Sequence, residues 1–345
     1  MTVTSVLIIT GNQLPARQAA IYPYQRVTQA TAPLHPLLVF DSEHYYNIAA
    51  YGYQSYPMNQ AFFPLYPLLV RGLSYITSTH IAMLVISAIC IPLSAIFLFL
   101  WARVELRLRG YGNNRTPFRM LLLIAIFPTS FFLVMGYNES LFIFLSAASL
   151  YFYRTDRPWL AGIFAAFSTA TRVQGCMIVL VFLLEYLLAK QWYDRYKLIP
   201  LLMAPLGIVA FMAYQWQVFG NPVAFVTAQH LWGKFSDNYL YSIASSISPS
   251  YIFFYIPILA FMLYLTYKKL GAVWLTYCVA PFLLCIVSGS LVSINRYALS
   301  AFPLFLALAI YLPTIKQPLQ IGLIFTCVIG LLMNISLVCN TIFIG

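Results

Sequence analysis

The sequence predicts an all-α integral membrane protein, folded as a bundle of about ten transmembrane helices. Of its 345 residues, 62% are hydrophobic and only 8% are charged, whereas an ordinary soluble domain carries roughly 25% charged residues. The apolar residues recur in stretches close to the roughly 20 residues that a helix needs to cross hydrocarbon, and short polar or basic connectors separate them. These observations indicate that lipid surrounds most of the chain and exclude an ordinary soluble core.

Hydropathy and helix breakers give the positions of the expected helices. Two of them are shorter than a full span, which favours tilted, re-entrant or locally thinned arrangements. No internal repeat or soluble domain is evident, so we divide the chain into an N-terminal segment, residues 1–79, and a membrane domain, residues 80–345, with a long connector at 219–248. The expected helices are 80–102, 120–136, 139–153, 158–171, 173–189, 198–218, 249–267, 271–291, 297–315 and 319–343.

Basic residues occupy alternate connectors between these helices. The net charge of +11 could suggest a nucleic-acid partner, but its placement in short loops favours a role in orientation, so no nucleic acid is expected. Ten alternating helices put thirteen basic residues on one face, and the positive-inside rule makes that face cytoplasmic. They are Arg103, Arg107, Arg109, Arg115, Arg119, Arg154, Arg157, Lys190, Arg195, Lys197, Lys268, Lys269 and Lys316.

Asp41 opens a predicted amphipathic helix, Ser42–Tyr51, in the external N-terminal segment. On that helix Asp41 lies beside His44, and Glu43 points elsewhere. A carboxylate at a low-dielectric boundary can take a proton from a hydroxyl. An alternative is that Asp41 only caps the helix by accepting hydrogen bonds from first-turn amides. Both readings are compatible with the sequence, and Glu43 and His44 are supporting candidates.

Three further charged residues fall at external helix ends. Glu139 suits the positive end of a helix dipole. Arg172, followed by Gln174, interrupts apolar sequence, which is typical either of a functional cavity or of a structural ion pair with Glu139. Arg296 can bind a phosphate through paired donors, or it can extend to the lipid headgroups.

The external connector 219–248 contains a cationic and aromatic set suited to a sugar or a phosphate. An ordinary interfacial loop would look similar. The six cysteines lie in apolar runs without metal-ligand spacing and are read as small hydrophobic residues. A requirement for a metal ion therefore stays open, and no organic cofactor is expected. The connector's candidates are Gln229, His230, Trp232 and Lys234.

Five sequence blocks, in one order along residues 38–310, carry a family resemblance. Phe40-Asp41-Ser42-Glu43-His44-Tyr45-Tyr46 and Phe62-Phe63-Pro64-Leu65-Tyr66-Pro67 resemble the first external loop of PIG-V-type mannosyltransferases. Four later blocks are also similar to that family. The second is Pro128-Thr129-Ser130-Phe131-Phe132 with Tyr137-Asn138-Glu139-Ser140-Leu141-Phe142, and the third is Thr171-Arg172-Val173-Gln174-Gly175. The fourth is Phe219-Gly220-Asn221-Pro222 through Trp232, and the fifth is Arg296-Tyr297 with Phe302-Pro303-Leu304.

This resemblance implies a GT-C glycosyltransferase: a multi-helix membrane fold, a sugar donor linked to polyprenyl or dolichyl phosphate, and an acidic residue in the first external loop, which Asp41 matches. Mannose is carried over by analogy only. The sequence departs from the family in two respects. The chain is compact and has no large loops, which favours a microbial relative whose acceptor is not a GPI precursor. A full membrane helix normally precedes the acidic loop, and the apolar run from Val3 to Thr10 is too short to span a bilayer.

The expected function is an inverting transfer of a hexose, mannose by analogy, to a hydroxyl of a lipid or glycan acceptor on the non-cytoplasmic face. Asp41 would be the base, and Arg296, Arg172 or Lys234 would hold the donor phosphate. The membrane would be the plasma membrane of a prokaryote or the endoplasmic reticulum of a eukaryote. The main alternative is a lipid or sugar transporter, although transporters often place charges at the membrane midplane rather than at one face. A non-catalytic partner subunit is a third reading.

Overall fold

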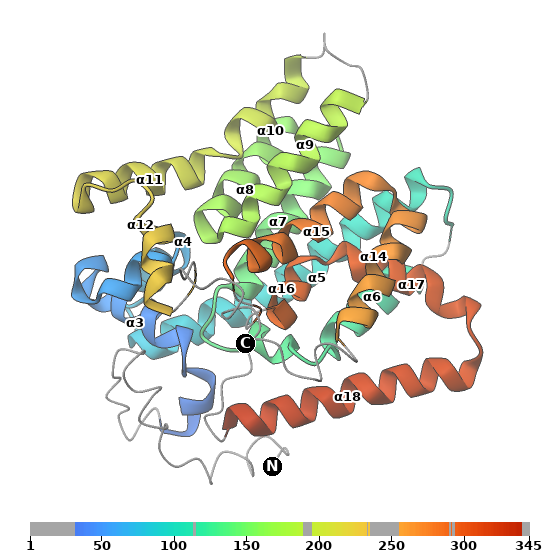
Figure 1. The fold of residues 1–345 in the computed structure, drawn as a ribbon, viewed down its shortest axis with the longest axis horizontal. Helices are drawn as coiled ribbons and strands as arrows, with labels where there is room; N and C mark the ends of the chain where they lie inside the picture. The colour runs from blue at the N-terminus through green and yellow to red at the C-terminus, as the bar shows by residue number, and fades with distance from the viewer. Residues whose placement is uncertain are drawn as a thin grey trace.

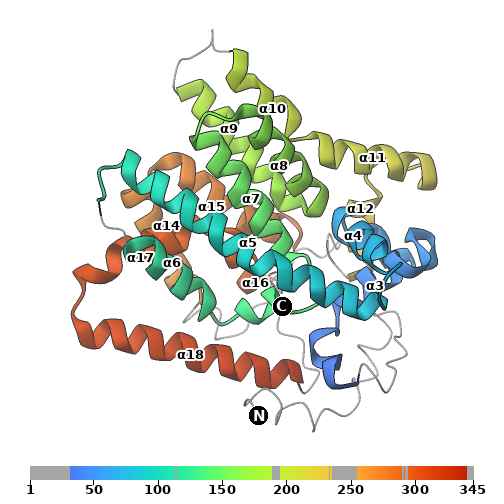
Figure 2. The ribbon, with the colours of Figure 1, turned by 180° about the vertical axis from the view of Figure 1, so that it is seen from behind.

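The computed structural model describes residues 32–112, 115–188, 195–232, 234, 255–289, 291 and 294–339, and within these ranges it is helical without strands. α5 (Thr79–Leu108) is the longest helix and runs diagonally through the whole molecule (Figures 1 and 2). Ser78 precedes the helix, and its hydroxyl accepts a hydrogen bond from the amide of Ile81 (3.3 Å), as is typical of a helix N-cap. α7 (Glu139–Arg154) packs along α5, and α8 (Pro158–Thr171) packs on α7.

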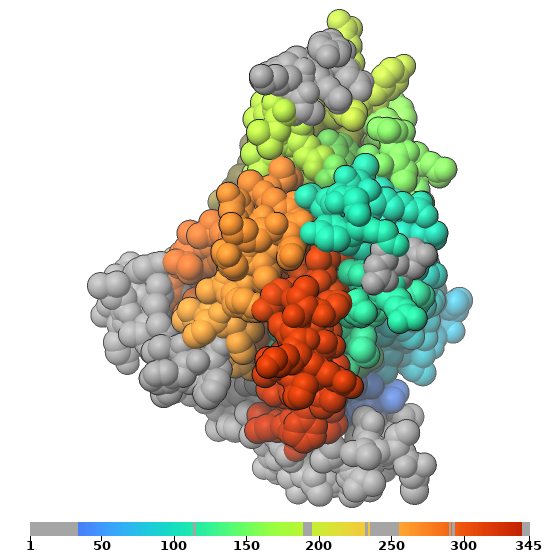
Figure 3. Space-filling model, turned by 90° about the vertical axis from the view of Figure 1, so that its right-hand side faces the viewer, coloured from blue at the N-terminus to red at the C-terminus, as the bar shows by residue number. Residues whose placement is uncertain are grey.

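The remaining helices surround this central group. α3 and α4 lie together at one end of α5, α11 and α12 approach them, and α9 and α10 lie beside α8 (Figure 1). α14, α17 and α6 lie next to one another on the face seen in Figure 3. The bounds are α3 (Asp41–Tyr51), α4 (Leu65–Leu73), α6 (Arg115–Ala125), α9 (Cys176–Leu188), α10 (Leu198–Met203), α11 (Leu206–Phe219), α12 (Ala224–Thr227), α14 (Ile256–Leu270), α15 (Ala272–Val287), α16 (Ile294–Ser300), α17 (Pro303–Tyr311) and α18 (Gln317–Cys339).

Short 3-10 helices connect these elements. The ones used below are η4 (Pro57–Ala61), η5 (Ser130–Leu133), η6 (Val173–Gly175) and η8 (Ala228–Trp232); the others are η2 (Ala32–Leu37), η3 (Tyr53–Ser55), η7 (Arg195–Lys197) and η10 (Leu312–Thr314). The N-terminal apolar run from Val3 to Thr10 and most of the connector 219–248 beyond Trp232 lie outside the described residues.

Three helical stretches in the described residues are long and apolar enough to cross a membrane: Thr79–Leu108, Arg195–Phe219 and Gln317–Cys339. A fourth is possible if the bent pair Ile294–Ser300 and Pro303–Thr314, which meet at 79°, forms one span. These helices make the chain a membrane protein. The expected number of ten crossings stays a prediction, because several apolar helices, such as Ala272–Val287, are shorter than a full span.

Most expected helices are found, but several differ in extent. The expected helix 198–218 is divided into α10 and α11 at residues 204–205, and the first part of the expected helix 249–267, residues 249–254, lies outside the described residues. The expected helix 120–136 is instead α6, which begins at Arg115 and ends at Ala125. Pro128 follows closely, and a residue that precedes proline avoids the helical conformation, so the chain continues as turns and η5. The expected helix 297–315 is broken between Ser300 and Pro303, where proline cannot donate the hydrogen bond that a continuous helix needs.

A buried ion network ties helix ends together at the end of α5 remote from α3. Glu105 accepts hydrogen bonds from Arg109 (2.8 Å), Arg154 (2.8 Å) and the indole nitrogen of Trp274 (2.7 Å). Arg154 also pairs with Glu185 (2.5 Å). Arg109 and Arg154 come from alternate basic connectors, so the structure brings these two connectors to one end of the bundle. We call this the basic end.

α18 lies apart from the bundle along most of its length (Figure 1). Only its C-terminal part packs closely, where the Asn334 side chain donates to the carbonyl of Pro128 (2.9 Å) and Val338 contacts the cluster of Phe131, Phe132 and Tyr137. Large apolar residues such as Phe325 are exposed on the rest of the helix. Such a face suits contact with lipid.

Candidate functional site

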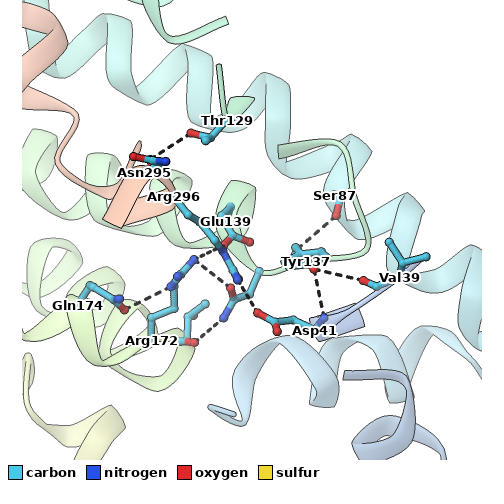
Figure 4. Close-up of polar contacts among 12 residues, drawn as sticks. Val39, Asp41, Ser87, Thr129, Tyr137, Glu139, Arg172, Gln174, Asn295 and Arg296 are labelled. Atoms are coloured by element: carbon cyan, nitrogen blue, oxygen red, sulfur yellow. Dashed lines mark hydrogen bonds and ion pairs between the residues drawn. The ribbon is translucent and has the colours of Figure 1, made fainter. Parts of the chain in front are cut away.

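The site forms at the opposite end from the basic network, where α3, α7, η6 and α16 meet (Figure 4). Asp41 is the first residue of α3, and its amide donates to the hydroxyl of Tyr137 (3.1 Å). That hydroxyl donates to the carbonyl of Val39 (3.2 Å). Phe40 precedes Asp41 with a φ of 60°, in the left-handed region that a bulky residue rarely adopts. The buried Tyr137 therefore holds the start of α3 in a sharp, constrained turn.

The carboxylate of Asp41 pairs with Arg296 from α16, far away in the sequence. Among the described hydrogen bonds, this carboxylate is joined to Arg296 and not to a first-turn amide. Arg296 also pairs through its Nε with Glu139, and its guanidinium lies over the rings of Phe132 and Tyr137, at 5.1 and 4.7 Å from their centroids. Arg296 is 4% exposed, so it does not extend to the lipid headgroups.

Glu139 joins a second arginine to the group. Its Oε1 atom lies 2.5 Å from Nη1 of Arg172, and Arg172 also contacts Asn138 and Gln174, both at 3.3 Å. Asn138 in turn donates to the carbonyl of Thr171 (2.8 Å), which fixes the end of α8 against the start of α7. Both of the sequence's alternatives for Arg172 are therefore compatible with the geometry: it forms the ion pair with Glu139, and it does so within the candidate site.

The turn that carries Arg172 depends on a glycine. Arg172 leaves α8 in an extended conformation, and η6 then brings Gln174 back toward the guanidinium. A Cβ atom on Gly175 would lie 2.6–2.7 Å from the backbone of Ser168 and Thr169. Only glycine permits so close an approach of the two chain segments.

The site contains two acids and two arginines in a largely buried cluster: Asp41, Glu139, Arg172 and Arg296. Burial by itself raises the pKa of the Asp41 carboxyl, but the Arg296 guanidinium, with smaller contributions from His44 and Lys234, lowers the pKa below its ordinary value. Asp41 is therefore ionised at neutral pH. Its side chain is 16% exposed, whereas that of Glu139 is 1% exposed, so Asp41 is the acid that a substrate can reach.

Glu43 and His44, which follow Asp41 on α3, have pKa values that burial shifts in opposite directions. Burial raises the pKa of Glu43 to about 8, so this carboxyl is mostly protonated at neutral pH. Burial lowers the pKa of His44 to about 4, and its Nδ1 atom contacts the amide oxygen of the buried Asn59 (3.1 Å). The His44 ring stacks on Phe62 at a centroid distance of 4.6 Å. His44 therefore joins α3 to the loop that follows it.

The predicted connector residues are only partly described. η8 and α12 pack on η4, so this part of the connector covers the loop after α3. Gln229 is half-buried and His230 is exposed, while the side chain of Trp232 lies outside the described part of the chain. Lys234 is half-buried, and its charge acts on both Asp41 and Cys285 of α15. The structure thus brings Lys234 towards the cluster.

Several residues of the site have no role assigned from sequence. Tyr137 and Phe132 belong to quoted family blocks, but nothing local shows that they support Asp41 and Arg296. Gln215 is fully buried in α11, where it donates to the carbonyl of Gln60 (2.8 Å) and accepts from the amide of Phe225 (2.9 Å). A polar side chain inside an apolar helix was the available signal for Gln215. It clamps the connector to the loop after α3.

No group of three or more histidine, cysteine, aspartate or glutamate side chains able to hold a metal ion occurs among the described residues. Both site carboxylates are instead paired with guanidinium groups.

The family model for mannosyltransferase (PIG-V) matches residues 23–230, more than half of the chain. The chain belongs to the PIG-V mannosyltransferase family. The match contains Asp41, Glu139 and Arg172, and the α3 loop that the sequence blocks identified. Arg296 lies beyond the matched residues, so its place beside Asp41 is a finding of the structure alone.

Curated relatives carry a more specific name. Over 150 residues the chain is 34% identical to GPI alpha-1,6-mannosyltransferase 2 of Cricetulus griseus and of Rattus norvegicus, and over 156 residues it is 35% identical to that of Mus musculus. These matches cover 41–42% of this chain and 29–30% of each relative. The chain therefore matches less than a third of the length of these relatives.

Among solved structures, the chain is similar to the oligosaccharyltransferase of Archaeoglobus fulgidus in the apo form, with a TM-score of 0.46 and 13% identity over 90% of this chain and 52% of that one. The same archaeal enzyme in complex with an inhibitory peptide and a dolichol-phosphate gives a TM-score of 0.45 over 89% of this chain and 51% of that one. At these scores the resemblance is distant.

Proposed function

We propose that this member of the PIG-V family transfers mannose, with inversion, from a polyprenyl- or dolichyl-phosphate carrier to a hydroxyl of a lipid or glycan acceptor on the non-cytoplasmic face. The observation that carries the proposal is the partly exposed, ionised Asp41, paired with Arg296 at the end of the bundle opposite the basic end. The family match supports the choice of mannose.

The chemistry needs a base for the acceptor and cations for the leaving phosphate. The acceptor oxygen attacks the anomeric carbon, the bond from that carbon to the phosphate oxygen breaks, and the acceptor proton passes to Asp41. A general base must be in its deprotonated form and must be reachable. Asp41 meets both conditions, whereas Glu43 is mostly protonated and buried.

The leaving phosphate gains negative charge, and cations positioned in advance stabilise that charge. Both arginines of the cluster already pair with carboxylates. Lys234 forms no ion pair with the described residues and acts electrostatically on Asp41, so we assign it the phosphate contact, with the arginines acting through their charge. Gln174, Gln229, His230 and Trp232 remain candidates for sugar contacts.

The acceptor class and the membrane belong to the same proposal. The curated relatives are named for GPI, which supports a lipid-linked glycan acceptor in the endoplasmic reticulum of a eukaryote; in a prokaryote the plasma membrane takes its place. A transporter is disfavoured because the ionisable groups of the site gather at one end of the bundle rather than along a path through it. No observation on the described residues favours that alternative.

The test is an assay of the purified protein in lipid nanodiscs with synthetic polyprenyl-phosphate mannose and a membrane lipid extract. We expect a mannosylated lipid product, detected by mass spectrometry, with polyprenyl-phosphate glucose serving as the donor control. If no hexose moves from any polyprenyl-phosphate donor to any lipid in the extract, while the protein remains folded, the proposal is wrong.

A further inference from the structure

The four charges of the cluster are arranged in a row, with Asp41 outermost and the rest buried. Arg296 lies between Asp41 and Glu139, and Glu139 lies between Arg296 and Arg172 (Figure 4). Both arginines converge on the same oxygen, Oε1 of Glu139. Each carboxylate is paired with a guanidinium group, so the formal charges of the two acids and the two arginines cancel. The cluster is therefore neutral in the resting protein.

Glu139 cannot itself take part in the transfer. It is 1% exposed, and its other oxygen, Oε2, has no hydrogen-bond partner among the described residues. A carboxylate so deeply buried is costly unless its charge is compensated. Its position beneath Arg296 indicates that it acts on the exposed end of the cluster through the guanidinium rather than by touching a substrate.

We propose that Glu139 is a positioning residue that keeps the cluster neutral at rest, so that the cluster carries a net positive charge only while Asp41 holds the acceptor proton. This inference rests on the proposed function. When the acceptor's O–H bond breaks and the proton moves to Asp41, the cluster changes from neutral to one positive charge. In the same step the phosphate gains one negative charge as its bond to the sugar breaks. When Asp41 later releases the proton, the attraction ends and the lipid phosphate can leave.

Two other groups act on Asp41, and neither changes this balance. Lys234 acts on Asp41 as a positive charge that none of the variants below alters. His44 is neutral at pH 7, because burial lowers its pKa to about 4. The net charge of the cluster is therefore set by its two acids and two arginines.

Binding of a non-reacting probe tests the charge balance directly. The probe is a polyprenyl methyl phosphodiester, whose single negative charge stays constant with pH, and affinity is measured by titration calorimetry at pH 7 with the full-length protein. With an effective dielectric constant of about 20, one unit charge about 10 Å away changes affinity by on the order of tenfold. Glu139→Gln leaves the cluster with one positive charge and should bind the probe about tenfold more tightly than the wild type.

Three further variants make an ordered series. Asp41→Asn mimics the protonated base and should bind as tightly as Glu139→Gln. Arg296→Gln leaves one negative charge and should bind about tenfold more weakly than the wild type. The double variant Glu139→Gln with Arg172→Gln is neutral again, so it should return to wild-type affinity. A purely structural role for Glu139 would weaken binding in its variants and would not be rescued by removing an arginine.

The outcomes separate this inference from the proposed function. Wild-type or weaker binding by a folded Glu139→Gln protein overturns the inference, even if the wild type transfers mannose. If Glu139→Gln does not fold, the other variants decide. The inference is then wrong if Asp41→Asn binds the probe no more tightly than the wild type, or if the affinity of the neutral double variant differs from that of the wild type. If the probe binds to no variant and no donor supports transfer, both proposals are wrong.

Discussion

The Asp41 carboxylate could act as a helix cap or as the general base, and these two roles predict different results when it is replaced by asparagine. The structure joins the Asp41 carboxylate to Arg296 and not to a first-turn amide, which disfavours the capping role; under that role Asp41→Asn would retain most activity, because asparagine caps a helix about as well as aspartate. Asparagine cannot accept a proton, and loss of a general base costs on the order of 100- to 10,000-fold in rate. We expect Asp41→Asn to insert, fold and bind donor but scarcely turn over, as measured by steady-state mannose transfer by the purified protein.

The matched control for Asp41→Asn is Glu43→Gln, which alters the other acid of α3. This carboxyl is mostly protonated at neutral pH and close to its amide in shape, so most activity should remain. Near wild-type turnover by Asp41→Asn would place the base elsewhere, and Glu43 would be the next candidate.

The buried carboxyl of Glu43 should make the folding stability of the protein depend on pH. Its pKa is raised by burial from its ordinary value of 4.5 to about 8, so between these values the folded protein binds more protons than the unfolded chain. The stabilisation that comes from the protonated Glu43 carboxyl is therefore fully present below pH 4.5, falls as the pH rises and is lost above about pH 8. We expect Glu43→Gln to remove this decline and to unfold at a higher temperature than the wild type at pH 9, but not at pH 4.5. Parallel thermal curves for the two proteins at both pH values would contradict the prediction.

At the scale of elements, the contact between α8 and α11 depends on a residue without a side chain. A Cβ atom on Gly207 would lie 2.0 Å from the carbonyl oxygen of Ala166 and 2.6 Å from the amide nitrogen of Ala170. Small residues allow such close helix packing within membranes. Gly207→Ala should separate the two helices and cost roughly 1–3 kcal/mol, the usual cost of overpacking. Thermal unfolding in detergent measures this loss.

Gly322 in α18 provides the control for the same substitution. Nothing lies within 4 Å of a Cβ atom built on it, and alanine is the better helix former by roughly 1 kcal/mol. Gly322→Ala should therefore leave stability unchanged or slightly higher. Equal destabilisation by both substitutions would show that the α8–α11 contact is looser than the structure indicates.

At the scale of the whole molecule, the site and the basic end lie at different levels of α5, since Tyr137 of the site contacts Ser87 and the basic end contains Glu105. Thirty residues of helix extend about 45 Å, enough to cross the hydrocarbon core. We expect a cysteine probe at Asn238, in the connector, to react with an impermeant reagent in intact cells, and one at Asn113 to react only after permeabilisation, with the native cysteines replaced. Labelling of both from the same side would rule out the proposed sidedness.

The class of the protein and the positions of its apolar helices follow from composition and hydropathy, which depend only on how many apolar residues occur in a row. Helices 139–153 and 158–171 could be predicted almost to the residue, because Asn138, Pro158 and the polar turn at Thr155 mark their ends in the sequence. The helix expected at 120–136 could not, because the influence of Pro128 on the preceding turn outweighed continuous hydropathy.

The identity of the candidate acid also came from sequence, since Asp41 stands in a recognisable block. The ion pair between Asp41 and Arg296 could not be predicted from the sequence. Arg296 lies 255 residues from Asp41, and sequence shows only a lone cation at a helix end, for which headgroups and phosphate were equally good partners. Tertiary packing gave Arg296 neither of these partners: it buried Arg296 against the carboxylates of Asp41 and Glu139, because a charge removed from water must find an opposite charge nearby. The sequence therefore determined which residues could carry the chemistry, and the fold alone determined which of their charges meet.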